Sequence, residues 1–434
     1  MSGTTQDDYT DRYARRVRGM TTSEIRALFS VASRPEVVSL AGGSPYIAAL
    51  PLDAVGEMLG KLASEHGASS LQYGIGQGTV ELRERICEVM SLSGINDASP
   101  DDVVVTVGGQ QALDLIARVF LDPGDVVLAE GPTYVGALGV FQAAQAQVRH
   151  VAMDADGLIP SALAAALEEC GGRAKFLYTI PTYQNPAGVT LSESRREEVL
   201  DICAAHGLLV VEDDPYGMLS FEGDAPLPLR ARRSDGVFYV STFSKTFAPG
   251  LRVGWVLAPH AVREKLVMAS EASILCPSAF AQGAVTQYLS TMPWREQIKV
   301  YREVYSERRD ALLEALDDLM PTGTSWTRPA GGLFVWGTLP TGLDSKAMMP
   351  RAIAARVAYV PGTGFYANET GTENMRLNFS FSSPDRLREG VRRLAGVMER
   401  ELDMRAVFGS TVDAPQHPQR RGTASADVPG PDLA

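Results

Sequence analysis

Long apolar runs and an excess of basic residues are both missing from this sequence of 434 residues. No run approaches the roughly eighteen consecutive apolar residues that a membrane-spanning helix requires. The formal net charge is −12, whereas a surface that binds nucleic acid needs basic residues to neutralise phosphates. We therefore expect neither a membrane nor a nucleic acid among the partners of this protein.

Cysteine and histidine are also scarce. The four cysteines contain no Cys-x-x-Cys pair, and none of the five histidines belongs to a His-Glu-x-x-His pattern, so no metal site is indicated. Reduced thiols in a cytoplasmic protein are the simplest explanation of widely spaced cysteines. The first ten residues are polar and acidic and lack the apolar region of a signal peptide. We therefore expect a cytoplasmic protein without a metal.

The middle of the chain alternates between short valine-rich runs and amphipathic stretches. Strands are predicted at residues 103–107, 126–129, 148–152, 176–179, 208–211 and 237–240, with helices such as 111–120, 161–169 and 192–206 between them. Such alternation predicts an α/β domain of three layers, with a mainly parallel sheet between helices. Active residues are then expected at the carboxyl ends of the strands.

The segments on either side of this region predict a second, smaller domain. Helices are expected at residues 21–32, 52–66, 80–93, 294–320, 346–356 and 385–403, and strands at 333–336 and 375–381. We expect residues 1–19 to be a mobile arm, 20–66 to contribute to the small domain, 67–300 to form the large domain, 301–405 to form a small α+β domain, and 406–434 to be disordered.

The most informative stretch is residues 241–255, which contains one of only six lysines. Lys245 has no other charged residue within six positions and is surrounded by small hydroxylated and aromatic residues. An amine in such a place loses proton affinity through desolvation, as a nucleophilic lysine requires. Thr242, Ser244 and Arg252 suit a dianionic phosphate. Together they indicate pyridoxal phosphate; the alternative is a surface loop with a solvated lysine.

Glycines follow the first predicted strand of the central region. Gly108, Gly109 and Gln110 come after that strand and open a helix, where backbone N–H groups face an anion at the positive end of the helix dipole. We expect an anion there, and the family resemblance described next implies that it is the cofactor phosphate; the alternative is a tight strand–helix turn.

The sequence around Lys245 resembles the lysine signature of class I and II aminotransferases, the fold-type I pyridoxal-phosphate enzymes. Further segments with this resemblance occur in the family's order at residues 23–26, 40–43, 72–74, 109–113, 185–188, 212–216, 242–245 and 374–380. The nearest branch contains 2-aminoadipate and kynurenine aminotransferases and the catalytic-like domains of MocR-type regulators. Only about twenty polar residues precede the first predicted helix, so we do not expect the winged-helix domain of those regulators.

The resemblance assigns roles to residues around the cofactor ring. Lys245 would bind the cofactor covalently and move the substrate α-proton, and Asp213 would hold a proton on the pyridine nitrogen. Asp214 is the alternative for this role, although the spacing to Tyr216 favours Asp213. Tyr216 and Asn185 would bond the phenolic oxygen, and a cis peptide is expected between Asn185 and Pro186.

Other roles concern the ring face, the partner subunit and the substrate. Tyr134 would stack on the ring, and Tyr73 would reach the phosphate in the neighbouring subunit of a homodimer. Arg376, in an apolar strand, would bind the substrate carboxylate; a structural salt bridge is the alternative. The substrate would also meet Asn185 and the remaining candidates, Gly43, Arg26 and Tyr46. Arg26 could equally be a solvated helix residue.

These features predict a homodimeric aminotransferase that moves the amino group of an α-amino acid to a 2-oxo acid, with 2-oxoglutarate expected. Another fold-type I reaction, by a cyclase, decarboxylase or β-lyase, would use the same residues. A regulatory protein that binds the cofactor without turnover is the alternative from a different class. The amino-acid donor is not indicated by the sequence.

Overall fold

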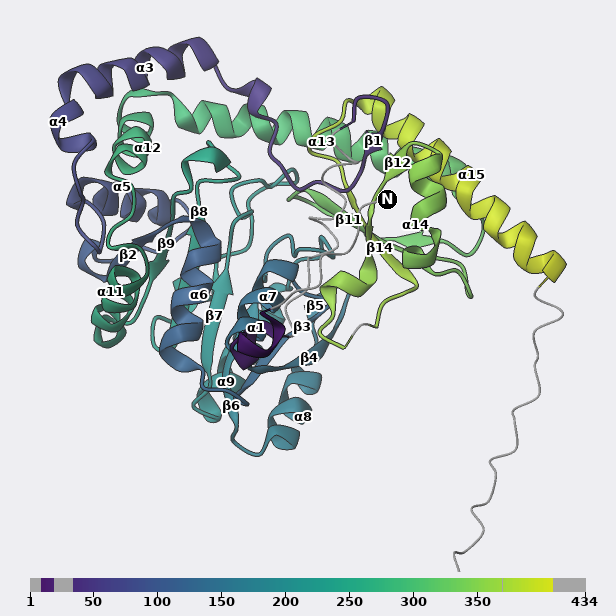
Figure 1. Ribbon diagram of the computed structural model, residues 1–434, viewed down its shortest axis with the longest axis horizontal. Helices are drawn as coiled ribbons and strands as arrows, with labels where there is room; N and C mark the ends of the chain where they lie inside the picture. The colour runs from purple at the N-terminus through teal and green to yellow at the C-terminus, as the bar shows by residue number, and fades with distance from the viewer. Residues whose placement is uncertain (1–8, 19–33, 369, 409–434) are drawn as a thin grey trace, which may run out of the picture.

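The computed structural model describes residues 9–18, 34–368 and 370–408 (Figure 1). Its large domain is built on an eight-stranded sheet in the order β2-β9-β8-β7-β6-β3-β4-β5. The strands are β2 (Val103–Thr106), β3 (Val126–Gly131), β4 (Gln147–Asp154), β5 (Gly157–Leu158), β6 (Ala174–Thr179), β7 (Leu209–Asp213), β8 (Val237–Thr242) and β9 (Gly254–Leu257). The six expected strands are therefore confirmed, with small differences at their ends.

Most of this sheet is parallel. The pairs β3–β4, β3–β6, β6–β7 and β7–β8 are parallel, whereas β9 runs antiparallel to both β2 and β8. The strand β9 was not expected, because its first two residues were interpreted only as the end of the lysine stretch, residues 241–255.

Helices cover both faces of the sheet because successive residues of each strand point to opposite sides. Val126 and Leu128 of β3 face one core, which includes residues of α8 (Pro160–Cys170) and α9 (Glu193–Ala205). Val127 and Ala129 face the other core, which includes residues of α6 (Gly108–Phe120) and α7 (Val135–Ala143). The expected three-layer α/β domain is thus confirmed.

The smaller domain is built around an antiparallel sheet. Its order is β10 (Ser325–Trp326), β11 (Phe334–Thr338), β14 (Asn374–Asn378) and β13 (Val360–Pro361). The helix α13 (Trp294–Leu319) runs from the large domain into the small one and packs on α15 (Pro384–Phe408) (Figure 1). The third helix here is α14 (Ser345–Ala354).

The N-terminal segment contacts both domains. Its strand β1 (Val38–Ser39) pairs in parallel with β12 (Val357–Ala358) of the small domain. Its helix α3 (Leu52–Glu65) instead packs on α12 (Ala279–Thr291) of the large domain. The remaining α-helices are α1 (Arg15–Arg18), α4 (Gly67–Ser70), α5 (Val80–Ser91), α10 (Leu229–Arg232) and α11 (His260–Ile274).

Both chain ends differ in part from expectation. Residues 10–12 and 15–18 form short helical turns within the segment that was expected to be a mobile arm. The helix α15 continues through Phe408, so residues 406–408 are helical rather than part of a disordered tail. The helix expected at residues 21–32 lies outside the described residues. No helix in the described part of the chain is long and apolar enough to cross a membrane.

Candidate active site

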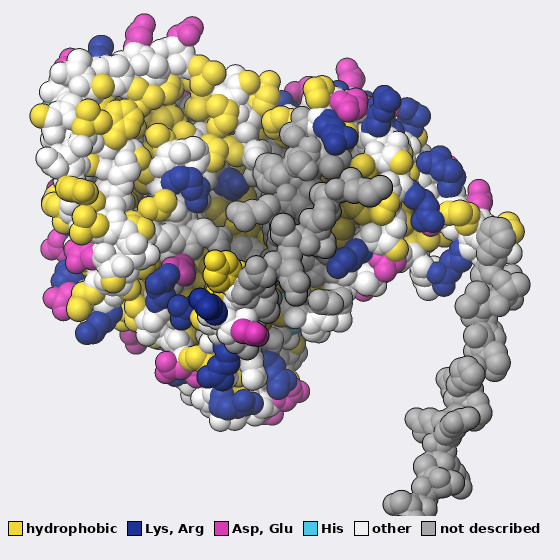
Figure 2. Space-filling view, viewed as in Figure 1, with side chains coloured by type: hydrophobic (Ala, Val, Ile, Leu, Met, Phe, Trp, Pro, Cys, Tyr) yellow, Lys and Arg dark blue, Asp and Glu magenta, His cyan; other side chains and the backbone are white. Residues whose placement is uncertain are grey.

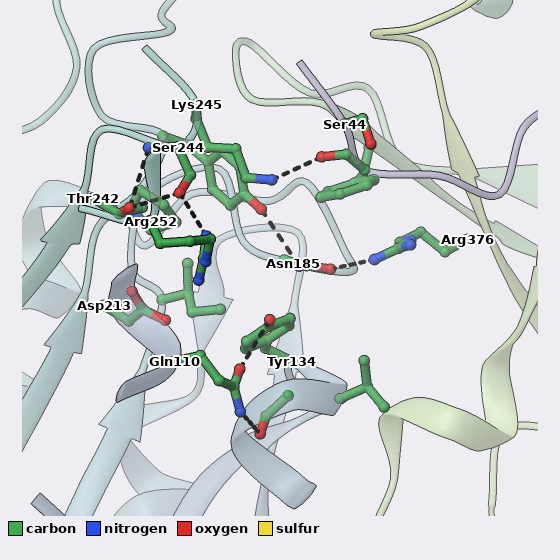
Figure 3. A pocket seen from close by; sticks show the side chains of 18 residues that line it. Ser44, Gln110, Tyr134, Asn185, Asp213, Thr242, Ser244, Lys245, Arg252 and Arg376 are labelled. Carbon is green, nitrogen blue, oxygen red and sulfur yellow. Dashed lines mark hydrogen bonds between the residues drawn. The ribbon is translucent and has the colours of Figure 1, made fainter. Parts of the chain in front are cut away.

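A cavity of about 630 Å³ lies where the carboxyl ends of the parallel strands face the small domain. Its walls contain residues from both domains (Figure 3). The candidate residues that it brings together are Gly43, Gly109, Gln110, Tyr134, Asn185, Asp213, Tyr216, Thr242, Ser244, Lys245, Arg252 and Arg376.

The lysine follows directly after β8. Lys245 Nζ points across the cavity and donates a hydrogen bond to the carbonyl oxygen of Gly43, at 2.7 Å (Figure 3). Burial lowers the pKa of Lys245 to about 8, and the positive charges of Arg376 and Arg252 act in the same direction. The amine therefore loses its proton at a much lower pH than a solvated lysine does, and it is a better nucleophile near neutral pH.

One end of the cavity is suited to an anion. Thr242 Oγ1 and Ser244 Oγ lie 2.9 Å apart, and Arg252 Nη1 donates to Ser244 Oγ at 3.2 Å. The helix α6 begins beside them, so its first N–H groups, near Gly109, add to the positive potential. Two hydroxyls, a guanidinium and a helix N-terminus form a suitable site for a phosphate.

Gly108 contributes to this end by its lack of a side chain. It does not line the cavity, whereas its neighbour Gly109 does, and a contact of Gly108 with the phosphate stays a prediction. Its φ is 74°, and a Cβ atom there would lie 2.3 Å from Arg252 Nη2. Glycine therefore leaves the space that the guanidinium of Arg252 occupies.

The structure distinguishes the two neighbouring aspartates at the end of β7. Asp213 lines the cavity, and its Oδ2 accepts a hydrogen bond from Tyr178 OH at 2.8 Å. Asp214 lies outside the cavity lining; its carboxylate accepts from Tyr239 OH at 2.9 Å and from the backbone N–H of Gly217 at 2.8 Å. Asp214 thus stabilises the strand end, and Asp213 is the carboxylate available to a ligand.

The environment of Asp213 disfavours its charge. Burial raises the pKa of Asp213 to about 7, and the negative charges of Asp214 and Glu130 raise it further, whereas the hydrogen bond from Tyr178 lowers it. A cation placed beside this carboxylate would restore its ionised form, because an opposite charge favours the charged state.

Asn185 joins two other candidates. Its Nδ2 donates to Tyr216 OH at 3.4 Å, and its Oδ1 accepts from Arg376 Nη1 at 2.9 Å (Figure 3). The expected cis bond between Asn185 and Pro186 is confirmed. The amide side chain therefore lies between a phenol and a guanidinium at the centre of the cavity.

Arg376 is buried, and no acidic residue in the described part of the chain forms an ion pair with it. Its Nη2 donates to the carbonyl oxygen of Ala41 at 2.9 Å, its Nε has no partner, and it forms no ion pair with any residue that the structure describes. Burial lowers its pKa to about 10, which leaves it protonated at neutral pH. A buried, unpaired guanidinium is costly, so a carboxylate ligand in the cavity would stabilise it.

The aromatic walls were only partly predicted. Tyr134 OH donates to Gln110 Oε1 at 3.2 Å, and Gln110 Nε2 donates to the carbonyl oxygen of Gly136 at 2.8 Å. Phe334 also lines the cavity and was not among the predicted site residues. The guanidinium of Arg376 lies 4.1 Å from the centre of the Phe334 ring. Further lining residues that were missed are Ser44, Val135, Gly136, Ile180 and Pro215.

Two further candidates lie outside the cavity lining. Tyr46 does not line the cavity; its ring lies 3.9 Å from the guanidinium of Arg308, and a contact of Tyr46 with substrate stays a prediction. Tyr73 is 78% exposed and outside the cavity of its own chain. Arg26 lies outside the described residues.

The fold and the cavity define the class of protein. A three-layer α/β domain with a smaller domain beside it, and a lysine, an aspartate and an anion site at the strand ends, characterise a fold-type I pyridoxal-phosphate enzyme. The model of the family "Aminotransferase class I and II" matches residues 36–394, and the chain belongs to this family.

Individual relatives agree with this assignment. The chain is 40% identical over 400 residues to aromatic-amino-acid aminotransferase 1 of Thermococcus litoralis, covering 91% of this chain and 96% of that one. The solved kynurenine aminotransferase of Pyrococcus horikoshii, in complex with PMP, is 39% identical with a TM-score of 0.87, covering 91% and 99% of the two chains. The α-aminoadipate aminotransferase LysN of Thermus thermophilus, complexed with N-(5'-phosphopyridoxyl)-L-leucine, is 34% identical with a TM-score of 0.84, covering 91% and 99%.

This protein is therefore an aminotransferase, and its cofactor is pyridoxal phosphate. The cavity fits that group in two respects. Arg252, Ser244 and Thr242 gather hydroxyl and guanidinium groups at one end, and the orphaned Arg376 Nε lies at the other. The first set suits the cofactor phosphate, and the second suits the carboxylate of an amino acid.

Proposed function

We propose that this aminotransferase works as a homodimer, transfers amino groups to 2-oxoglutarate, and uses Lys245 as its central catalytic residue. The observation that carries the proposal is the joint placement, in one cavity, of Lys245, Asp213 and a buried Arg376 that forms no ion pair within residues 9–18, 34–368 and 370–408. The three provide a nucleophilic amine, a partner for the ring nitrogen and a receptor for the substrate carboxylate.

The residues that hold the cofactor follow from the two ends of the cavity. Thr242, Ser244, Arg252 and the N-terminus of α6 bind the phosphate. Tyr134 packs on the ring, where an offset stack fixes its tilt. Bound pyridoxal phosphate supplies an aldehyde that condenses with amines and a protonated ring that withdraws electrons from the substrate α-carbon.

Each remaining residue acts on a proton or a charge. With the cofactor bound, Asp213 would be ionised beside the protonated ring nitrogen and would hold that proton in place. The Tyr216 hydroxyl and the Asn185 amide, which lie within hydrogen-bond distance of each other, would donate to the phenolic oxygen of the ring. Arg376 binds the substrate α-carboxylate and so orients the α-carbon towards the amine of Lys245. Lys245, with its lowered pKa, accepts the α-proton and returns it as a general acid.

The dimer is supported by an exposed apolar surface. We use the name apolar surface for five residues that are each at least 37% exposed: Leu71, Tyr73, Ile75, Ile274 and Leu275. The two segments that carry them lie side by side, because Gly74 is next to Pro277 and Ala279. Hydrophobic side chains gather on the side of the molecule formed by α3, α4, α5 and α12 (Figure 2). A second copy that covers this surface would bury it. We propose that Tyr73 then reaches the partner's phosphate site.

The donor is proposed from the relatives' names. Aromatic amino acids, kynurenine and 2-aminoadipate are the first to test, because aminotransferases named for them are 34–40% identical to this chain. Arg26, for which we retain the proposed contact with a distal carboxylate, would matter only for dicarboxylic substrates. A cytoplasmic location also stays a prediction.

Two measurements test the proposal. Borohydride reduction followed by peptide mapping should locate the cofactor on Lys245; label on any other lysine contradicts the assignment. A panel of donors with 2-oxoglutarate should give glutamate from at least one of the named classes. Turnover that requires another oxo acid would reject 2-oxoglutarate as the acceptor.

A further inference from the structure

A second tyrosine–aspartate pair lies next to the one at the cavity. Tyr178 OH donates to Asp213 Oδ2 at 2.8 Å, and Tyr239 OH donates to Asp214 Oδ2 at 2.9 Å. Both tyrosines are at most 3% exposed, and neither lines the active-site cavity. The two pairs share their chemistry and burial, but only Asp213 lines that cavity.

The contact of Tyr178 is set by the sheet. Tyr178 belongs to β6, which pairs in parallel with β7, and it lies opposite Val211, two residues before Asp213. Its ring packs edge-on against Phe141 with the ring centres 5.6 Å apart. The hydroxyl is therefore fixed by the sheet and the core, and it approaches Asp213 from outside the cavity lining.

We propose that Tyr178 is the positioning residue that orients the carboxylate of Asp213 towards the ring nitrogen of the cofactor. This inference rests on the proposed role of Asp213. The hydroxyl binds Oδ2 of Asp213, and no described residue forms a hydrogen bond with Oδ1, which is therefore available to a ligand. Tyr178 itself touches neither cofactor nor substrate.

The charges around Asp213 show why such support matters. Burial and the neighbouring carboxylates of Asp214 and Glu130 all raise the pKa of Asp213, and the Tyr178 hydrogen bond opposes them. A hydrogen bond donated to a carboxylate favours its ionised form. Without the hydroxyl, Asp213 is free to rotate and takes up a proton at a higher pH, and either change weakens its hold on a protonated ring.

The test uses Tyr178→Phe, with Tyr239→Phe as the matched control. Each variant loses one buried hydroxyl from an equivalent pair, and phenylalanine keeps the ring packing. Binding of 4′-deoxypyridoxine 5′-phosphate to the apoprotein is measured by calorimetry, because this analogue lacks the aldehyde and cannot react with Lys245. We expect about ten-fold weaker binding or more for Tyr178→Phe, the size of a lost hydrogen bond to a charged group. Tyr239→Phe should stay within about two-fold of the unaltered protein.

A second ligand separates positioning from general damage. The same proteins are titrated with the analogue of 4′-deoxypyridoxine 5′-phosphate in which carbon replaces the ring nitrogen. Tyr178→Phe should bind this second analogue with the same affinity as the unaltered protein. An equal loss with both analogues, or equal losses in Tyr178→Phe and Tyr239→Phe, overturns the inference.

Asp213→Asn shows which proposal has failed. If this variant binds the nitrogen-containing analogue as well as the unaltered protein does, the assigned role of Asp213 is wrong and the inference falls with it. If Asp213→Asn weakens binding and Tyr178→Phe does not, only the role of Tyr178 is rejected.

Discussion

At the scale of single residues, the site depends on charges held away from water. Lys245, Asp213 and Arg376 each have a pKa shifted towards the neutral form, and burial is the largest cause in all three. The cofactor would bring an aldehyde for Lys245 and a ring nitrogen for Asp213, and the substrate would bring a carboxylate for Arg376. The apoprotein should therefore be less stable than the loaded enzyme, and its stability should depend on pH.

Asp213→Asn should change how the stability of the apoprotein depends on pH. An unfolded aspartate has a pKa of about 3.9, and folding raises that of Asp213 to about 7. Between these pH values Asp213 is protonated in the folded state and ionised in the unfolded state, so the stability of the fold falls as the pH rises. The destabilisation by the buried carboxylate is complete above a pH of about 7. Thermal unfolding should show that Asp213→Asn becomes more stable, relative to the unaltered apoprotein, as the pH rises from about 5 to about 8. A difference that stays constant across this range would show that Asp213 is already ionised in the fold.

Arg376→Lys should impair recognition of the substrate carboxylate. Lysine keeps the charge but loses the planar fork that contacts Asn185 and Ala41. We expect kcat/KM for amino acids to fall about 10- to 100-fold, as for a lost charged hydrogen bond. Half-reaction rates with an amine that lacks the carboxylate should change little.

Arg308→Lys is the control for that substitution. Arg308 is also buried, donates to the carbonyl oxygen of Ser380 and lies over Tyr46, outside the cavity. If both substitutions lower kcat/KM equally, the effect of Arg376 is structural rather than due to substrate binding.

At the scale of elements, β9 supports the phosphate end of the cavity. A Cβ at Gly254 would lie 2.7 Å from the carbonyl carbon of Gly108 and 2.8 Å from the N of Gly109. The strand therefore approaches the start of α6 as closely as backbone allows. Only a residue without a side chain permits this approach.

Gly254→Ala should displace the start of α6 and weaken cofactor binding. We expect a loss of stability of about 1–3 kcal/mol, typical of an overpacked site, together with a higher dissociation constant for pyridoxal phosphate. Gly250→Ala is the control, since a Cβ there meets nothing within 4 Å. Equal cofactor affinities in the two variants would show that β9 does not set the phosphate site.

The elements also show what the sequence could predict. Strands such as β2, β3 and β8 were identified because they are buried on both faces and read as continuous apolar runs. The strand β9 was missed because four residues after a glycine-rich turn carry little periodic signal. Asp213 and Asp214 are adjacent, and only the tertiary positions of Tyr178 and Tyr239 distinguish them. Phe334 was missed because its entry into the cavity depends on how the small domain packs.

At the scale of the whole molecule, the cavity is lined by residues of both domains. Residues 36–394 carry the family match, and the N-terminal segment contacts both domains. The site therefore depends on contacts between segments distant in sequence, as in the hydrogen bond from Lys245 to Gly43. Tyr73 would extend this dependence to a second chain.

Leu275→Glu should weaken the proposed dimer. Leu275 is 57% exposed within the apolar surface, and a carboxylate there would have to be desolvated on association. Sedimentation should show monomers, with activity lost in parallel. Val407→Glu, at a residue 67% exposed at the end of α15, should stay dimeric and active. A fully active Leu275→Glu monomer would refute the shared site.

The central claim, amino-group transfer centred on Lys245, is tested most directly by a half-reaction without an acceptor. The purified enzyme is mixed with an aromatic amino acid, kynurenine or 2-aminoadipate, and its absorbance is followed. The account predicts conversion of the bound cofactor to its pyridoxamine form, reversal on adding 2-oxoglutarate, and no conversion in Lys245→Ala. Release of carbon dioxide or of an eliminated side chain, with the cofactor left in its aldehyde form, would contradict it.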